Sequence, residues 1–530
     1  MKQFLFSVIL LTQVFSHRLT AEVTITELPD RIRVTIDGAL FTEWRHQEWA
    51  GPFLYPVIGP NGENVTRHFP MKPGVPGEEQ DHPHHRSIRF SHSDVNGFNF
   101  WWAPGKERAK HTAEVRLEKI EKLTSGQTGE IVLWNQWLGD GKPVLREQVR
   151  LIFTPLPNRE LLLDYDVTLH APAGTPVRLS DKRDGGLLVR VAGTMKVESE
   201  KGEKGSGTIL NSRGDRNEAA WGKRAEWADY SGPDASGRTV GIAMFDHPAN
   251  LRFPTPWHAR TYGLVTANRF GTDHFRANYN DHKTVICSPA GTNCPACNSH
   301  SGDYTIPAGA SLTLRHRLYF HHGDSPTANV TARYRDYTAA RELIPHRMQA
   351  LLQERRWKEL IEQFGPEDFT NWPAELSRQA SESLHLRGQT YSFLKDGLRA
   401  ETDLQAALQL TPRNETLWLT LADNYTNNLN DDTQALAAYR QAFALTGNGN
   451  GWQPLTATVS IARILTNQVK PAEALAVLQT YGNLDGMAPV WRIKLLRAYG
   501  HAYAAHGKEQ ESLASFREAL QLEAQLSTKP

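Results

Sequence analysis

The sequence predicts a multidomain protein in which an all-β antiparallel sandwich, residues 22–325, is followed by an all-α helical repeat domain, residues 326–530. Three observations support this prediction. The chain has 530 residues, which is more than one ordinary hydrophobic core can hold. Apolar residues recur with a period of two in the first part of the chain. After the segment HHGDSP they recur with helical spacing, and this change places the boundary near residue 325.

Residues 1–21 have the features of a secretory signal peptide. Lys2 precedes the apolar run from Phe4 to Leu11, which is shorter than the roughly 20 residues that a membrane helix needs. Cleavage is expected near Ser16 or Ala21, and an uncleaved membrane anchor is the alternative. Apart from this segment, no stretch is long and apolar enough to span a bilayer. The sequence therefore predicts a periplasmic or secreted protein.

Segments between residues 22 and 325 alternate apolar and polar residues, as strands of a half-buried antiparallel sheet do. Examples are RIRVTIDG, with Ile32, Val34 and Ile36, and the segments LLLDYDVTLHA and LTLRHRLYF. Turn-forming segments such as GDGKP, PLPN and APAGTP separate the runs at the intervals expected for a sandwich. No convincing amphipathic helix occurs in this part, so we expect a large sandwich whose long loops carry the binding groups.

The last part of the chain contains repeated helix pairs. The segment RAYGHAYAAHGKEQESLASFREALQL carries Gly500, Tyr503, Phe516 and Ala519 in a small, aromatic, aromatic, small order. A second copy contains Trp418, Leu421, Ala422, Tyr425, Ala435, Tyr439 and Ala442, and a degenerate copy contains Ile461, Leu465, Ala474 and Leu478. The pattern resembles tetratricopeptide repeats and implies a solenoid over residues 328–525. Such a stack offers a concave surface to a protein partner; the alternative is a mere support for the β domain.

The charge balance excludes one class of partner. The chain has 59 lysine and arginine residues against 58 aspartate and glutamate residues, and no long run of one charge. A chain without a basic field does not attract the phosphates of nucleic acid. We therefore expect no nucleic-acid partner.

The segment DHPHHRSIRFSHSDVNGFNFWW, residues 81–102, is rich in chemically useful side chains. Pro83 favours an extended backbone at His82, so His82 and His84 are expected on one face and His85 on the other. Two imidazoles at this spacing can chelate a divalent or transition metal, but Ile88 stands where a third, carboxylate ligand is needed. A metal held by His82 and His84 is thus not favoured, and the cofactor is unknown.

Proton transfer is the second interpretation of this segment. Imidazole titrates near neutrality, with an ordinary pKa of about 6.5, so His84 or His85 is expected to act as acid or base. Arg86 lies beside them in the sequence and would stabilise an oxyanion or hold a carboxylate. A third interpretation is a loop whose histidines are exposed or bond to the backbone.

Aromatic residues end the same segment. If the strand continued, Phe98, Phe100 and Trp102 would share one face and Trp101 would lie on the other. At least one tryptophan is therefore expected outside the core. Because indole faces stack on the C–H faces of sugar rings, Trp101 and Trp102 are candidate saccharide platforms.

Three further segments combine polar and aromatic residues in the same way: SDKRDGGLLVRVAG, WGKRAEWADYSGP and FDHPANLRFPTPWHARTYGLVTANRFG. Four such segments in one all-β domain are expected to converge on a pocket. Lys182 is expected to stabilise negative charge beside His84, His85 and Arg86. The candidate ligand-binding residues are His82, His92, Asn96, Trp101, Trp102, Arg190, Trp221, Lys223, Trp227, Asp246, His247 and His258.

All three cysteines, Cys287, Cys294 and Cys297, lie in the segment CSPAGTNCPAC. One disulfide with one remaining thiol is expected in an oxidising compartment. A zinc site with His300 as fourth ligand is the alternative. Haem attachment is excluded because Asn298 follows the last cysteine.

The segments DHPHHRSIRFSHSDVNGFNFW, WGKRAEWADYSGP and FDHPANLRFPTPWHARTYGL together resemble a family of exported bacterial proteins called methane oxygenase PmoA-like, also carried as a domain of unknown function. The resemblance covers residues 22–323. A DTKEGG-like segment of the family appears here as DKRDGG, residues 181–186, which keeps Lys182. The stretch 287–300 departs from the family as an insertion. The resemblance implies no established catalytic residues, and its label suggests a metal-dependent oxygenase.

The leading hypothesis is an exported carbohydrate-related protein that binds a saccharide and acts on it by histidine acid–base chemistry, as a lyase, epimerase or hydrolase. Paired carboxylates of the glycosidase kind are not evident, which favours elimination or epimerisation. The alternative is a non-catalytic ligand-binding protein that recruits a partner through its helical repeats. The third hypothesis is the metal-dependent oxygenase.

Overall fold

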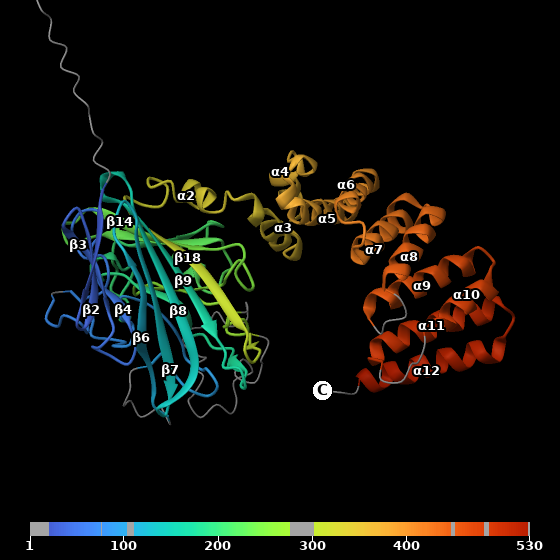
Figure 1. The fold of residues 1–530 in the computed structure, drawn as a ribbon, viewed down its shortest axis with the longest axis horizontal. Helices are drawn as coiled ribbons and strands as arrows, with labels where there is room; N and C mark the ends of the chain where they lie inside the picture. Colours follow the sequence, from blue (N-terminus) through green and yellow to red (C-terminus); the bar gives the residue numbers. More distant parts are fainter. Residues whose placement is uncertain are drawn as a thin grey trace, which may run out of the picture. The chain divides into compact units, whose positions relative to one another are not determined.

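A computed structural model describes residues 21–75, 77–102, 111–275, 302–446, 451–481 and 487–527 (Figure 1). The chain divides into two compact units, Met1–Ala339 and Ala340–Pro530, called here the β unit and the helical unit. The prediction of antiparallel sheets followed by helices is confirmed. The expected signal peptide and the three cysteines lie outside the described residues.

Two eight-stranded antiparallel sheets form most of the β unit. The first sheet has the order β1 (Val23–Leu28), β2 (Arg31–Ile36), β3 (Ala39–Arg45), β4 (Phe53–Val57), β5 (Ile88–His92), β11 (Gly185–Arg190), β16 (Leu264–Ala267) and β15 (Trp257–Arg260). The second has the order β12 (Thr208–Asn211), β13 (Trp227–Pro233), β14 (Thr239–Asp246), β18 (Ser311–His322), β9 (Leu161–His170), β8 (Lys142–Pro155), β7 (Gly129–Gly139) and β6 (Ala113–Thr124). A small sheet pairs β10 (Val177–Leu179) with β17 (Tyr304–Ile306).

One hydrophobic core joins the two large sheets, as the period of two predicts. Phe41 of the first sheet packs edge-on against Phe153 and Phe320 of the second, with ring centroids 6.0 and 5.4 Å apart. The ring centroids of Trp44, on the first sheet, and Tyr165, on the second, lie 6.3 Å apart, with the ring planes tilted by 47°. The strand segments predicted from alternation are β2, β9 and β18.

Helix α2 (Val330–Tyr337) follows the expected boundary at residue 325 but belongs to the β unit. Its Val330 and Tyr334 pack in a cluster with Trp227, Phe245 and Tyr319, which lie on the second sheet. This cluster is separate from the core between the sheets. The helix therefore covers part of the second sheet on the side away from that core.

The helical unit consists of paired helices (Figure 1). They are α3 (Ile344–Gln353), α4 (Trp357–Phe364), α5 (Ser377–Phe393), α6 (Gly397–Leu410), α7 (Glu415–Asn424), α8 (Asp432–Thr446), α9 (Trp452–Asn467), α10 (Pro471–Gln479), α11 (Pro489–Ala505) and α12 (Glu509–Ser527). The three predicted copies correspond to α7 with α8, α9 with α10, and α11 with α12. A Cβ on Gly500 would lie 2.7 Å from the ring of Phe516, so the small and aromatic residues of the last copy face each other.

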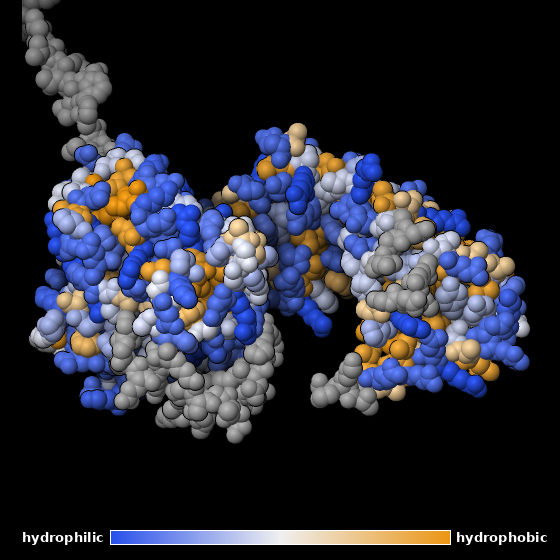
Figure 2. Space-filling view, turned by 60° about the horizontal axis from the view of Figure 1, so that its bottom comes forward, coloured by the Kyte–Doolittle hydropathy of each residue, from blue (hydrophilic) through white to orange (hydrophobic). Residues whose placement is uncertain are grey.

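Hydrophobic side chains reach the surface of the helical unit at several places (Figure 2). Leu398 is 70% exposed and Val469 is 85% exposed. In the part of the chain that the structure describes, no helix is long and apolar enough to cross a membrane. The protein partner and the tetratricopeptide assignment of this unit stay predictions.

A glycine at the centre of the first sheet permits close approach of two strands. Gly186 in β11 has φ +92°, and a Cβ there would lie 1.9 Å from the carbonyl oxygen of Ala267 in β16. A residue with a side chain would be strained by its backbone angle and would push β16 away. The position of β16 beside β11 therefore requires glycine at residue 186.

We predict that Gly186→Ala destabilises the β unit by about 3 kcal/mol more than Gly141→Ala, because both positions have positive φ but only the first meets a backbone atom. Urea unfolding followed by tryptophan fluorescence measures the difference. Gly141 lies in the turn between β7 and β8, where an added Cβ meets nothing within 4 Å. Equal losses from the two substitutions would contradict the packing argument.

Candidate functional site

The candidate site is built on the face of the first sheet that points away from the core. Across β5, β11, β16 and β15 the register aligns Arg89, Leu188, Thr266 and His258 in one row. Directly paired residues point to the same face of a sheet. Two residues along the strands, Arg190, Leu264 and Arg260 form a neighbouring row on that face. We call this surface, with Arg89, Arg190, His258, Arg260 and Thr266, the polar face.

The polar face is covered by other parts of the β unit. Arg89, Arg190, His258 and Thr266 are each at most 2% exposed. Trp101 is fully buried in a small cluster with Leu188 and Leu264 of this face. The guanidinium of Arg89 donates to the carbonyl of Trp101 at 2.7 Å, which ties the covering segment to the sheet.

The expected extension of the histidine segment is wrong. His82 has a left-handed backbone, with φ +39°, and the N–H of His85 donates to the carbonyl of His82 at 2.9 Å. The chain therefore turns between these residues instead of continuing as a strand. As a result the rings of His82 and His85, expected on opposite faces, are stacked 4.7 Å apart.

The expected alternation of the aromatic tail is also wrong. Strand β5 ends at His92, and residues 99–102 form no strand. Trp101 is fully buried, while Trp102 is half-buried and lies 4.4 Å from the ring of His84. Of the two tryptophans, Trp102 is therefore the one that retains exposure.

A network of charges fixes the histidine turn. The guanidinium of Arg67 donates to the carboxylate of Asp81 and to the carbonyls of Asp81 and His82, at 2.8 and 2.7 Å for the two carbonyls. Arg190 donates to the same carboxylate at 3.1 Å. Nδ1 of His82 lies 2.6 Å from Asp81 Oδ2. Burial opposes ionisation of Asp81, but His82, Arg190 and Arg67 together hold its pKa well below the ordinary range.

Aromatic rings surround this network. Tyr262, in the turn between β15 and β16, stacks on His82 at 5.4 Å, and the guanidinium of Arg190 lies 4.4 Å from the Tyr262 ring centre. His84 contacts His85 edge-on at 4.3 Å. Burial, and then the neighbouring His84 and Arg190, lower the pKa of His85 well below 6.5. His85 is therefore neutral at pH 7.

Seven of the sequence-predicted residues meet at or on the polar face: His82, His84, His85, Trp101, Trp102, Arg190 and His258. Nδ1 of His258 lies 4.0 Å from Asp184 at the other end of this surface. Arg86 lies between the rings of Trp49 and Phe53, at 5.0 and 5.3 Å. Its guanidinium is therefore held by these two aromatic rings.

Three predicted residues lie to one side of this group. His92 projects toward the core, where its Nε2 donates to the carbonyl of Ser180 at 2.9 Å, and burial lowers its pKa to about 4. The ammonium of Lys182 lies 3.8 Å from Asp94 and is 37% exposed. Asn96 occupies an exposed turn and donates to the carbonyl of Pro176. Their contacts are those of residues that stabilise loops.

The third and fourth segments separate in the structure. Trp221 packs against Phe275, whose ring lies 6.1 Å from that of His258, so this tryptophan borders the polar face. Lys223 is exposed. By contrast, Trp227, Asp246 and His247 lie beside helix α2 on the second sheet. Each of the four segments therefore contributes residues to the polar face or its border, as expected. Trp227, Asp246 and His247 do not lie there.

Five residues of the site are not among those predicted from the sequence: Arg67, Asp81, Arg89, Tyr262 and Thr266. A sequence signal exists for two of them. In SIRFSH and GLVTA, polar residues alternate with the apolar ones that enter the core, which places Arg89 and Thr266, each on its own strand, on the side away from the core.

The residues present do not fit a metal ion well. In the part of the chain that the structure describes, three potential ligand atoms come within 4.8 Å of one another only at Asp81, His82 and Glu200. Asp81 already binds two guanidiniums, which would repel a divalent cation. The His82 and His84 pair of the sequence analysis is not part of such a group, and no reaction step is assigned to a metal.

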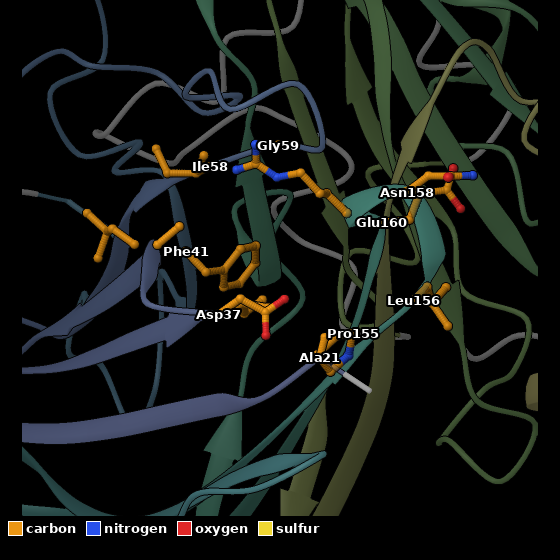
Figure 3. A pocket seen from close by; sticks show the side chains of 13 residues that line it. Ala21, Asp37, Phe41, Ile58, Gly59, Pro155, Leu156, Asn158 and Glu160 are labelled. Carbon is orange, nitrogen blue, oxygen red and sulfur yellow. The ribbon is translucent and has the colours of Figure 1, made fainter. Parts of the chain in front are cut away.

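A separate pocket of about 390 Å³ lies where the ends of β2, β3, β4 and β8 meet (Figure 3). Figure 3 shows Phe41, Ile58 and Leu156 on its walls. Its carboxylates are used locally, because Glu160 accepts from the hydroxyl of Tyr319 at 2.7 Å and Asp37 accepts from the N–H of Glu22 at 2.8 Å. This arrangement offers no acid–base pair comparable to Asp81 and His82.

Comparison with known proteins identifies the β unit. The profile of a family of unknown function, DUF6807, matches residues 31–335. The chain belongs to the DUF6807 family. No curated protein matches this DUF6807 chain.

Solved structures resemble parts of this DUF6807 chain weakly. A crystal structure of MamA is 17% identical, covers 33% of this chain and 89% of its own, and has a TM-score of 0.26. BtubC from P. vanneervenii is 14% identical, covers 39% of this chain and 90% of its own, and has a TM-score of 0.30. Scores of this size carry no argument about function.

We predict that Asp81→Asn destabilises the β unit by about 3 kcal/mol at pH 7, because it removes the carboxylate that two buried guanidiniums share. The folded-state pKa of Asp81 lies below its ordinary value of 3.8. Its contribution to stability is therefore present above about pH 4 and is lost as the pH falls further. Denaturation curves of both proteins between pH 3 and 7, at roughly one-unit intervals, measure this difference.

Asp140→Asn is the matched control, since Asp140 pairs with His111 at 2.7 Å but both side chains are about half exposed. It should unfold like the wild type at pH 7. Equal stability of the Asp81 and Asp140 variants would contradict the prediction that the buried ion pairs of Asp81 stabilise the β unit.

Proposed function

We propose that the β unit is an enzyme that transfers a proton on a saccharide, with His82 as the acid–base group. The observation that carries the proposal is the bond between Nδ1 of His82 and the carboxylate of Asp81, at 2.6 Å. A carboxylate on one ring nitrogen holds the proton there and leaves the lone pair on Nε2. The sequence analysis assigned the chemistry to His84 and His85, and the proposal transfers that role to His82.

Exposure separates the three histidines. The side chain of His82 is 28% exposed, whereas His84 and His85 are 2% and 3% exposed. A general base must reach the proton that it removes. His85 is neutral and stacks on His82, so it shapes the position of the reacting ring without adding charge.

Aromatic surfaces beside His82 support a saccharide as the substrate class. Tyr262 stacks on His82, and the half-buried Trp102 lies next to His84. Rings of this kind present apolar faces with polar edges, which suits the C–H face of a sugar. Asp81 and Glu200 place two carboxylates here, but Asp81 is bound by two guanidiniums and by His82, so it is not available as the acid or nucleophile of glycoside hydrolysis, and elimination or epimerisation is favoured.

In the proposed step, Nε2 of His82 takes the proton from a carbon next to a carbonyl or carboxylate of the sugar. The electron pair of the broken C–H bond moves onto that carbonyl group. In epimerisation water gives a proton to the other face of the carbon, and His82 passes the proton that it removed to solvent. In elimination the electron pair returns to form a C=C bond, the C–O bond at the next carbon breaks, and the leaving oxygen takes the proton that His82 removed. Export to the periplasm or medium is part of the same proposal.

We predict that His82→Gln lowers turnover about 100-fold or more while leaving ligand affinity within a factor of about three, because glutamine keeps polarity but cannot exchange a proton. Full-length protein is incubated in D₂O with a panel of oligosaccharides, and deuterium incorporation at carbon is followed by NMR. Deuterium at the carbon reports epimerisation, and the vinyl signal of the unsaturated product in the same spectra reports elimination.

His111→Gln is the control, because His111 also pairs with an aspartate but is exposed and lies outside the site. It should exchange deuterium at the wild-type rate. Binding of a saccharide by the wild type with neither deuterium exchange nor unsaturated product would reject the enzyme and leave the non-catalytic binding protein as the function.

A further inference from the structure

The polar face contains an unusual group of buried hydrogen-bond donors without acceptors. Arg89 Nε, Arg190 Nε and Nη1, Arg260 Nε and Trp101 Nε1 are buried and have no hydrogen-bond partner. Thr266 Oγ1 and His85 Nδ1, which can donate or accept, are also buried and have no hydrogen-bond partner. A buried unpaired donor costs roughly 1–3 kcal/mol, and native proteins contain few of them.

These unpartnered atoms lie close together on one face of the first sheet. Arg89 and Thr266 belong to one row across the sheet, and Arg190 and Arg260 belong to the next row. Trp101 covers Leu188 and Leu264 between them, and its ring lies 5.7 Å from that of His85. The unpartnered atoms therefore surround the place where the histidine turn meets the sheet.

Among the residues that the structure describes, two of the guanidiniums in this group have no carboxylate partner. Arg190 pairs with Asp81, which it shares with Arg67, and lies 3.9 Å from Glu79. In the described part of the chain, neither Arg89 nor Arg260 has a carboxylate within ion-pair distance. Burial lowers the pKa of Arg89 to about 9, so it still carries its charge at pH 7.

We propose that the polar face binds the carboxylate of an acidic saccharide, so that the substrate of the proposed reaction is a uronic acid unit. Hydrogen-bond donors that lack an acceptor favour a ligand with several acceptor atoms. Guanidiniums that lack a carboxylate partner favour a ligand with negative charge. This inference rests on the proposed function, because it names the substrate of the same site. The carboxylate acidifies the neighbouring C–H bond, and the guanidinium N–H groups stabilise the enediolate that forms when His82 takes the proton.

Calorimetric titration of the full-length protein tests the inference. The probes are oligosaccharides of uronic acids, the same oligosaccharides with their carboxyl groups reduced to alcohols, and sulfated neutral oligosaccharides. We expect the uronates to bind and their reduced forms to bind at least tenfold more weakly. Arg260→Gln should weaken uronate binding at least tenfold, while Arg116→Gln, an exposed arginine on β6, should not.

Arg89→Lys is a second variant, but it alters a buried side chain and its folding must be checked by circular dichroism. Equal affinity for uronates and their reduced forms, or no binding of any uronate, would overturn the inference. Binding of sulfated probes alone would overturn the carboxylate assignment. Uronate binding that depends on Arg260 but gives neither deuterium exchange nor unsaturated product would support the acidic ligand and reject the proton transfer. Deuterium exchange on neutral sugars would support the proton transfer and reject the acidic ligand.

Discussion

The carboxylate of Asp81 is the anion on which the candidate site depends. It accepts hydrogen bonds from Arg67, Arg190 and His82, which come from three different segments of the β unit. Burying an ion costs several kcal/mol unless such donors replace its water. Because Arg67 also binds two carbonyls of the histidine turn, one carboxylate fixes both the backbone and the ring of His82 relative to the first sheet.

Much of the fold could be predicted from the sequence because local patterns and tertiary burial agree. Strand β9 buries every second residue, and β2 and β18 do so over Ile32–Val34 and Leu312–Leu318, as their alternation indicates. The helix pairs follow their repeats, for example where Gly500 leaves room for Phe516. The histidine turn could not be predicted, because Pro83 favours extension at His82 while the contacts with Arg67 require a left-handed turn.

The site itself could be predicted only in part. Alternation shows which residues of one strand share a face, but it does not show which strands are neighbours. Arg89 and His258 therefore look unrelated in the sequence, although the register places them in one row. For the same reason, Asp246 and His247 resemble the site residues in composition yet lie beside helix α2.

The order of strands in the first sheet also determines when the candidate site assembles during folding. His92 of β5 pairs with Gly185 of β11, which closes a loop of roughly 90 residues, and β16 joins later still in the sequence. Pairing across such distances is slow compared with local structure. A newly made chain thus has all the histidines and arginines long before it has a site. Activity in this protein would report that the sandwich has closed, and not merely that its residues are present.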